Sequence, residues 1–293
     1  MLKMMLPELP DYYTDDLIKN ALKEDINYID VTTDLLIQAG SRGEARIIAK
    51  EDGVLAGIGI ASRVFRLLDS TAELTHMNDG QSFKKGDKIA EIKASAAAIL
   101  KAERTALNFL QHMSGIATYT QHCVEAVSGT GVQITDTRKT LPGLRVLQKY
   151  AVLCGGGCNH RFNLTSAAMI KDNHADFFGG SVSTAIKTLR ERVGHMVVIE
   201  AEVRDFEQLR EAIDAGADVI MLDNMNTDMM REAVKITAAR AKLEASGNIT
   251  LQNIRETAET GIDIISLGAL SHSVKALDLS LQLRTCLHKQ THC

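Results

Sequence analysis

The chain contains no tryptophan and few aromatic residues of any kind. Aromatic residues make up 4% of its 293 residues, whereas hydrophobic residues make up 45%. Any core must therefore be aliphatic, and a chain of this length can bury one large core or two modest ones. The sequence also lacks an apolar run near the roughly 20 residues that a membrane-spanning helix needs. It therefore predicts a protein without a membrane partner.

An excess of positive charge is absent as well. The 33 Lys and Arg residues are outnumbered by 37 Asp and Glu residues, for a net charge of −4. Nucleic-acid-binding domains normally present a basic face, so we expect no nucleic-acid partner. The five cysteines are odd in number and irregularly spaced, which is typical of a reducing compartment. No signal peptide is visible, and these absences together predict a cytoplasmic protein.

Against this acidic background, one part of the chain concentrates positive charge. Residues 137–161, TRKTLPGLRVLQKYAVLCGGGCNHR, contain no acidic residue, and the segment IKDNH that follows adds Lys171. Net charge affects only solubility and steering, whereas a local cluster of cations is a property of a site. This cluster indicates a pocket for a polyanionic small molecule.

Residues 1–115 differ in pattern from the rest of the chain. We expect an amphipathic helix at 15–23, strands near 44–50, 53–56 and 73–76, and a hairpin over 79–92. The hairpin resembles those of biotinyl and lipoyl carrier domains, which carry a modifiable lysine at a tight turn, but no such motif stands out here. A long helix is expected over 96–112. Arg104 lies at the edge of its apolar face, where it either snorkels beside Glu103 or serves a site.

From Val132 onward the pattern becomes a strand–helix repeat. Residues that close the expected strands are spaced by 35, 29, 23, 23 and 22 positions: Asp136, Lys171, Glu200, Asp223, Ser246 and Gly268. Such alternation predicts a parallel sheet with right-handed crossovers. An open sheet would carry polar ends only at its switch point, so polar ends on nearly every strand favour a closed or nearly closed barrel. A last helix, from Ser273 to about His288, is expected to return to the first domain.

The strand ends bring two kinds of charge together. The cationic candidates are Arg104, Arg138, Lys139, His160, Arg161 and Lys171. They face the carboxylates of Glu200 and Asp223, which would suit Mg²⁺ bridging substrate phosphates. The turns Ser246-Gly247-Asn248 and Gly268-Ala269 suit a phosphate, since barrels often hold one in their last loops.

Each of these features has a plainer explanation when it is taken alone. Lys139 could be an ordinary surface cation, Glu200 and Asp223 could form structural ion pairs, and Gly155-Gly156-Gly157 could be a flexible helix exit. A metal site at Cys154, Cys158 and His160 is a further alternative, although its spacing fits no familiar zinc pattern. Taken together the plainer explanations fail, because the charges would then gather at strand ends with no ligand.

Seven segments carry a resemblance to a known family. They are ERTALNFLQHMSGIAT, DTRKTLPGLR, KYAVLCGGGCNHR, IKDNH, AGADVIMLDN, LEASGNI and SLGALSHS. In content and order they are similar to the quinolinate phosphoribosyltransferases over nearly the whole chain. The resemblance implies an α/β fold: an N-terminal α/β sandwich domain at 1–115, with the C-terminal helix 273–293 packed on it, and an incomplete parallel α/β barrel at 116–272. It also implies a homo-oligomer, either a dimer or a larger assembly.

The resemblance further implies a reaction, in which quinolinate and phosphoribosyl pyrophosphate give nicotinate mononucleotide, pyrophosphate and CO₂ with Mg²⁺. By matching motif positions, the carboxylates of quinolinate would lie against Arg138, His160, Arg161 and Lys171, beside Thr137, with Arg104 supplied in trans by the partner subunit. Lys139 would lie near the pyrophosphate, and Glu200 and Asp223 near Mg²⁺ and the ribose. The 5-phosphate would lie on Ser246, Gly247, Asn248, Leu267, Gly268 and Ala269. Catalytic roles would fall to Lys139, Lys171, Glu200 and Asp223.

Other readings of the sequence differ in function. A paralogous protein associated with molybdenum uptake is the nearest alternative, and GGGCNHR together with KDNH favours quinolinate over it. A non-catalytic ligand-binding protein on the same scaffold would not need every candidate catalytic residue, and all are present. A phosphoribosyltransferase of the other major fold would show paired acids before a Gly-Thr loop, and VIMLDN shows neither. One small departure from the family pattern is Ala175, after IKDNH.

Overall fold

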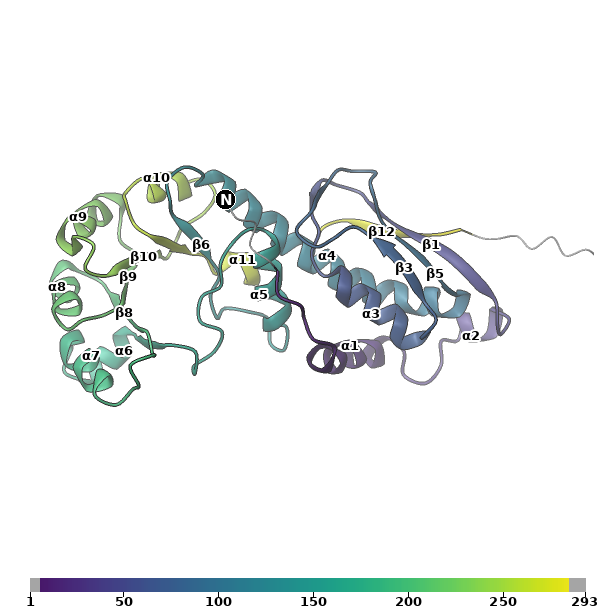
Figure 1. Cartoon of the computed structure of the whole chain (residues 1–293), viewed down its shortest axis with the longest axis horizontal. Coiled ribbons are helices and arrows are strands. Elements are labelled where there is room, and N and C mark those ends of the chain that lie inside the picture. The colour runs from purple at the N-terminus through teal and green to yellow at the C-terminus, as the bar shows by residue number, and fades with distance from the viewer. Residues whose placement is uncertain (1–5, 285–293) are drawn as a thin grey trace, which may run out of the picture. The chain divides into compact units, whose positions relative to one another are not determined.

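The computed structural model describes residues 6–284 of the chain, which form two compact units (Figure 1). Among these residues, the first unit holds 6–119, 141–156 and 274–284, and the second holds 120–140 and 157–273. No helix in the described part of the chain is long and apolar enough to cross a membrane. The sequence placed residues 141–156 in the barrel domain, but their contacts place them in the first unit.

The first unit is built on a four-stranded antiparallel sheet. The strand order is β12-β1-β5-β3, with β1 at Arg42–Ala49, β3 at Glu73–His76, β5 at Lys88–Ser95 and β12 at Leu279–Arg284. A separate pair joins β2 (Gly53–Val54) and β4 (Ser82–Phe83). The helices are α1 (Asp11–Asp25), α2 (Thr33–Leu36), α3 (Ile58–Leu68), α4 (Ala96–Ala126) and α5 (Arg145–Cys154). The core is aliphatic apart from Phe65 and Phe83, as the composition predicts.

The predicted hairpin over 79–92 is wrong. Its first arm, β4, pairs with β2, whereas its second arm, β5, lies between β1 and β3. The turn residues do reverse the chain, since Gly80 and Gly86 both have positive φ. The turns do not determine which strands pair. The eight residues of β5 pair with the eight residues of β1, whereas β4 has only two residues that could form cross-strand pairs.

The predicted C-terminal helix is also wrong. Residues 279–284 form β12, which pairs antiparallel with β1 from Ala49↔Leu279 to Glu44↔Arg284. The reason is visible in the sequence as a strict alternation of Leu with polar residues from Leu277 to Arg284, which is the period of a strand. The chain does return to the first unit, as a strand of its sheet. The part of the predicted helix beyond Arg284 lies outside the described residues.

The second unit is a six-stranded parallel sheet with order β6-β11-β10-β9-β8-β7. Its strands are β6 (Gln133–Thr135), β7 (Ala168–Ile170), β8 (Ile199–Val203), β9 (Val219–Asp223), β10 (Lys242–Ser246) and β11 (Ile264–Ser266). Its helices are α6 (Asp172–Phe177), α7 (Val182–Arg190), α8 (Phe206–Asp214), α9 (Thr227–Thr237), α10 (Ile254–Ala258) and α11 (Ala269–His272). In Figure 1, α7 to α10 lie along one side of these strands. Among the described residues no pairing joins β6 to β7, so the expected incomplete barrel is confirmed.

Local chemistry explains where the barrel helices begin. Ser181, Asp205 and Asn226 each accept a hydrogen bond from a backbone N–H in the first turn of α7, α8 and α9. These caps satisfy donors that the helix itself leaves unpaired. Each helix therefore starts at a defined point after its strand, which fixes where the strand's carboxyl end emerges.

The segment 158–161 lies at the open side of the barrel. Cys158 forms a parallel bridge with Thr135 at the edge of β6. Three residues later, Arg161 donates a hydrogen bond from Nη1 to the carbonyl of Ala167, next to β7, at 3.0 Å. The segment thus connects the two edge strands and brings two ionisable side chains, His160 and Arg161, inside the barrel.

Candidate active site

A cavity of about 440 Å³ lies at the carboxyl ends of the barrel strands. Its lining consists of Thr137, Arg138, Lys139, His160, Arg161, Met169, Lys171, Glu202, Met221, Asp223, Ser246 and Ser266. Eight of the sequence-predicted residues are therefore together in one place: Thr137, Arg138, Lys139, His160, Arg161, Lys171, Asp223 and Ser246. The predicted residues that do not line it are Arg104, Glu200, Gly247, Asn248, Leu267, Gly268 and Ala269.

Strand ends position most of the lining. Lys171 comes directly after β7, Asp223 is the last residue of β9 and Ser246 is the last of β10. Neighbouring parallel strands align these ends, since Ser246 is in register with Asp223. Side chains alternate along each strand, so residues two apart enter the same interior at different depths. A second cavity, of about 250 Å³, lies one layer deeper and includes Glu200, Val219 and Glu244.

Glu200 does not close its strand, so that prediction is wrong. β8 continues to Val203, and Glu200 is 5% exposed. Glu202, two residues further on, lies at the cavity instead, with Oε2 3.6 Å from Nζ of Lys171. The run IEAEV contains both glutamates on one face, so the alternation of a longer strand would have found Glu202. The sequence estimate ended the strand too early because it followed the apolar residues alone.

Charges of like sign are forced together in this cavity. Burial and the neighbouring Arg138 both lower the pKa of Arg161. On the acidic side, burial raises the pKa of Glu202, Lys171 opposes that shift, and the charge of Asp223 adds to it. The cavity therefore holds a cationic side, suited to an anionic ligand, and a pair of carboxylates, suited to a cation.

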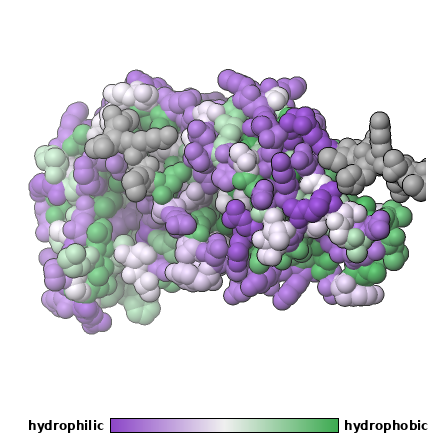
Figure 2. Space-filling model, turned by 45° about the vertical axis from the view of Figure 1, so that its right-hand side comes forward, coloured by the Kyte–Doolittle hydropathy of each residue, from purple (hydrophilic) through white to green (hydrophobic). Residues whose placement is uncertain are grey.

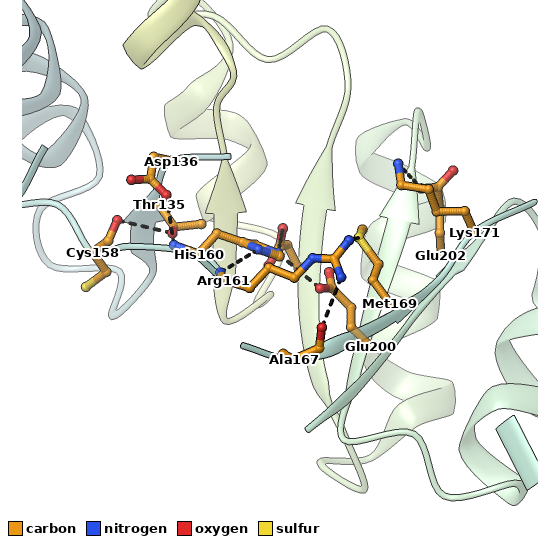
Figure 3. A network of polar contacts seen from close by, with 11 residues as sticks. Thr135, Asp136, Cys158, His160, Arg161, Ala167, Met169, Lys171, Glu200 and Glu202 are labelled. Carbon is orange, nitrogen blue, oxygen red and sulfur yellow. Dashed lines mark hydrogen bonds and ion pairs between the residues drawn. The ribbon is translucent and has the colours of Figure 1, made fainter. Parts of the chain in front are cut away.

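His160 and Arg161 line both cavities, and Figure 3 shows the polar contacts that hold them. Asp136 accepts hydrogen bonds from the backbone N–H of His160 at 2.9 Å and from Nδ2 of Asn159 at 2.7 Å. His160 Nε2 lies 3.0 Å from Oε2 of Glu200 and 3.6 Å from Oε1 of Glu244. Asp136 and Glu200 are buried, which makes this anchoring network a fixed part of the barrel.

Apart from Ser246, which lines the cavity, the residues of the predicted phosphate loops show close packing around their glycines. Gly247 has φ +94°, and a Cβ there would lie 2.2 Å from Oδ1 of Asn224. Asn248 donates a hydrogen bond to that same oxygen at 3.0 Å, so Asn224, which the sequence reading missed, ties the loop after β9 to the loop after β10. A larger residue at 247 would therefore collide with Asn224 and would also be strained by the positive φ.

The second predicted loop lies beside Lys139. A Cβ at Gly268 would lie 2.9 Å from Nε2 of His272 and 3.1 Å from Cδ of Lys139. Ser271 donates a hydrogen bond to the Lys139 carbonyl at 2.8 Å, whereas Leu267 is buried in the core. His272 was not predicted, although its position in SLGALSHS, one helical turn after Gly268, is a usable signal.

Two comparisons with known proteins agree with this geometry. The C-terminal domain model of quinolinate phosphoribosyl transferase matches residues 116–282, and the N-terminal domain model matches residues 30–114. The chain is 48% identical over 268 residues to a probable nicotinate-nucleotide pyrophosphorylase (carboxylating) of Bacillus subtilis, covering 91% of this chain and 92% of that one. This chain belongs to the quinolinate phosphoribosyltransferase family.

The similarity to relatives in this family extends over most of their length. A quinolinate phosphoribosyltransferase (decarboxylating) of Nicotiana tabacum is 40% identical, covering 97% of this chain and 86% of that one. Among solved structures, NadC from Streptococcus pyogenes has a TM-score of 0.92 at 41% identity, covering 95% of this chain and 99% of that one. The resemblance seen in the sequence is thus confirmed, together with its two-part fold.

The alternative metal site at Cys154, Cys158 and His160 finds no support in the structure. Burial raises the pKa of both thiols, which opposes the thiolate that a metal requires. Within residues 6–284, the one group of His, Cys, Asp and Glu side chains close enough to share an ion is His160, Glu200 and Glu244.

The predicted substrate-binding residue Arg104 does not lie in the barrel: it is exposed on α4 and belongs to the first unit.

Proposed function

We propose that this protein is a pentosyltransferase that transfers the phosphoribosyl group of phosphoribosyl pyrophosphate to quinolinate. Decarboxylation follows, and the products are nicotinate mononucleotide, pyrophosphate and CO₂, in de novo NAD biosynthesis. The observation that carries this proposal is the cavity in which Arg138, Arg161 and Lys171 meet Glu202 and Asp223. Cations suit an anionic substrate and a pair of carboxylates suits a metal-bound phosphate, so the two together fit a site that holds both side by side.

Quinolinate recognition is the task of the cationic side. An Arg guanidinium presents a rigid fork that matches a carboxylate, and a Lys ammonium adds a point charge. Arg161 is already oriented, because its guanidinium donates to the Ala167 carbonyl at 3.0 Å and contacts the Met169 sulfur at 3.5 Å. With Arg138 and Lys171 it supplies enough charge for two adjacent carboxylates on a pyridine ring.

The carboxylate pair fits Mg²⁺. Glu202 and Asp223 lie on neighbouring strands, and the charge of Asp223 raises the pKa of Glu202, a repulsion that a divalent cation would relieve. We assign the metal to these two residues, in place of the Glu200 and Asp223 pair expected from the sequence. When bound, Mg²⁺ neutralises the pyrophosphate leaving group.

The chain's own residues carry the remaining chemistry. Lys139, beside the glycine loop of α11, lies where it can hold the departing pyrophosphate. As that group leaves, positive charge develops on the ribose, and Glu202 or Asp223 stabilises it. The pyridine nitrogen attacks from the opposite face. Its new positive charge stabilises the electron pair that stays on the adjacent ring carbon when the carboxylate leaves as CO₂, and that carbon then takes up a proton from water.

We also propose that the active assembly is a homodimer or a larger oligomer that places Arg104 of one subunit in the site of its partner. Arg104 is exposed on α4, between the buried Ala102 and Thr105, so its guanidinium is available to a partner. The setting is a reducing compartment, the cytoplasm, consistent with the free thiols of Cys123, Cys154 and Cys158.

The test is a direct assay of the purified protein with quinolinate, phosphoribosyl pyrophosphate and Mg²⁺. We expect nicotinate mononucleotide and CO₂ in equal amounts, no product after chelation with EDTA, and recovery when Mg²⁺ is added back. Full turnover in metal-free buffer would contradict the proposed requirement for Mg²⁺. Absence of product with all components present, in a protein shown to be folded by circular dichroism, would overturn the function itself.

A further inference from the structure

The barrel interior contains a second cavity, which we call the deep cavity. It has a volume of about 250 Å³, room for several waters, and lies toward the opposite end of the strands from the substrate cavity. Its lining includes Gln133, Val219 and Ile264, the first residues of β6, β9 and β11, whereas the last residues of strands line the substrate cavity. Ser166 and Val198 also line the deep cavity and are exposed, so this cavity opens to solvent.

A carboxyl group in the deep cavity lies beside a hydroxyl group in the substrate cavity. Glu244 of β10 lines the first cavity and Ser266 of β11 lines the second. Glu244 is in register with Ile264, two residues before Ser266, so both side chains enter the barrel from neighbouring strands. Burial raises the pKa of Glu244 most, and the charge of Glu200 adds to that shift. His160 and the hydroxyl of Ser266 oppose it, which places both groups close to the carboxyl.

Both groups are buried and lack hydrogen-bond partners. Glu244 is 2% exposed and Ser266 is 3% exposed. Within the described residues, neither Oε1 of Glu244 nor Oγ of Ser266 has a hydrogen-bond partner. A buried polar atom that stays unpaired costs free energy, so its presence in a folded protein indicates a further role. These two atoms lie between the cavity that opens to solvent and the cavity proposed to bind substrate.

The proposed decarboxylation needs a proton at this place. When CO₂ leaves, the bond between the two carbons breaks and its electron pair stays on the ring carbon. Until that carbon is protonated, CO₂ can recombine with it, so a donor held nearby raises the net rate. The nucleotide occupies the substrate cavity from its mouth, which leaves the deep cavity as the route for a proton from water.

We propose that Ser266 is a catalytic residue that donates this proton, and that Glu244 is a positioning residue that orients the Ser266 hydroxyl and reprotonates it. The ring carbon takes the hydroxyl proton, Oγ takes a proton from the Glu244 carboxyl, and the carboxylate regains one from solvent through the deep cavity. One proton is thus consumed for each CO₂ released. The raised pKa of Glu244 favours the protonated carboxyl that this transfer needs. This proposal rests on the proposed function and concerns only its decarboxylation step.

The first experiment follows two products of a single turnover of the purified protein. Pyrophosphate reports phosphoribosyl transfer, and ¹⁴CO₂ from quinolinate labelled in the carboxylate next to the nitrogen reports decarboxylation. We expect Ser266→Ala and Glu244→Gln to release pyrophosphate at nearly the wild-type rate and CO₂ at least about tenfold more slowly. The nucleotide that still carries both carboxylates should therefore accumulate, as mass spectrometry would detect.

The two time courses separate this proposal from the proposed function. Equal slowing of both products would assign Ser266 and Glu244 to binding or packing and overturn the proton transfer. CO₂ release at the wild-type rate in both variants would overturn it as well. If the wild-type protein releases neither product, the proposed function fails instead.

Two further variants test the hydroxyl itself. Ser266→Thr keeps a hydroxyl on the same strand, so we expect CO₂ release within about threefold of wild type. Ser62→Ala is the matched control, because Ser62 is also buried with an unpartnered Oγ but lies in the first unit, and both products should form at wild-type rates. CO₂ release as slow in Ser266→Thr as in Ser266→Ala would overturn the role of the hydroxyl.

Discussion

At the scale of single residues, the position of a glutamate along a barrel strand determines whether it reaches the cavity. Glu200 and Glu202 lie on the same face of β8, yet Glu200 is among the buried residues and Glu202 lines the substrate cavity. A shift of two residues moves a carboxylate by about 6.6 Å along a parallel strand. The same chemical group therefore holds an imidazole in one layer and meets Lys171 in the next.

The two glutamates should consequently respond differently to the same substitution. We expect Glu202→Gln to raise the Mg²⁺ concentration needed for half-maximal activity by about tenfold or more, because one of two carboxylates is lost. Glu200→Gln should leave that concentration near the wild-type value. Titrating activity against Mg²⁺ measures both, and an exposed glutamate, Glu207→Gln, serves as the control. If Glu200→Gln raised the required Mg²⁺ concentration and Glu202→Gln did not, Glu200 would be the metal ligand instead.

Substrate choice is also a residue-scale property. We expect quinolinate to be used with far higher kcat/KM than nicotinate, since a site built for two carboxylates leaves a cationic side chain unpaired when one carboxylate is missing. Such unpaired charge costs several kcal/mol, about a thousandfold in rate. Parallel assays with both acids at the same enzyme concentration provide the measurement. Comparable efficiency with nicotinate would contradict the decarboxylating reaction.

At the scale of elements, the C-terminal strand returns to the first unit along α4. Leu277 donates its backbone N–H to the Gln111 carbonyl at 3.0 Å, and Nε2 of Gln111 donates to the Leu279 carbonyl at 2.7 Å. One turn further on, Gly115 leaves room for the backbone of Lys275. The end of the chain is thus joined to its middle by hydrogen bonds before it pairs with β1.

Gly115→Ala tests this contact. A Cβ at position 115 would lie 2.2 Å from the Lys275 carbonyl oxygen, so overpacking should lower the free energy of unfolding by about 1–3 kcal/mol. In a helix with free space, the same substitution stabilises by up to about 1 kcal/mol. Gly59→Ala in α3, where the added Cβ meets nothing within 4 Å, is the matched control. Urea unfolding measures the free energy of unfolding of both variants. Equal values for the two would contradict the close contact at Gly115.

At the scale of the whole molecule, the described surface is mixed in character. Figure 2 shows polar residues over much of one face, with apolar patches between them. Large apolar side chains are exposed on and near α1 and α2, among them Tyr12, Tyr28, Leu35 and Leu36. Exposed apolar surface of this kind is consistent with the proposed homo-oligomer.

The shared site is tested by subunit complementation. Arg104→Ala and Lys171→Ala should each be inactive alone, whereas a mixed dimer would contain one complete site, so partial activity should return after subunit exchange. Arg138→Ala mixed with Lys171→Ala is the control, because both residues line the same cavity of one chain and no complete site can form. If exchange is verified and the first mixture stays inactive, Arg104 serves its own subunit or only its packing.

Much of this protein can be predicted from the sequence alone. The strand–helix repeat, the resemblance in seven segments and the cations of residues 137–171 are local patterns, so they predicted the barrel and eight of the lining residues. Local patterns failed where pairing is long-range. The partners of β4, β5 and β12 depend on which strands meet in space, and neither turn residues nor helix propensity contain that information.

Only the tertiary structure could separate Glu200 from Glu202 and show which groups meet each nitrogen of the His160 ring. Depth in a barrel is set by the register of neighbouring strands, in which Glu200 lies beside Val219 and Glu202 beside Met221. The surroundings of the imidazole are also set by packing, since Nδ1 of His160 meets the backbone nitrogen of Arg161 and Nε2 meets Oε2 of Glu200. The sequence determined which ionisable groups are available to this site. Packing decided which of them face the cavity and which hold the others in place, because hydrogen bonds and burial depend on neighbours that the order of residues does not specify.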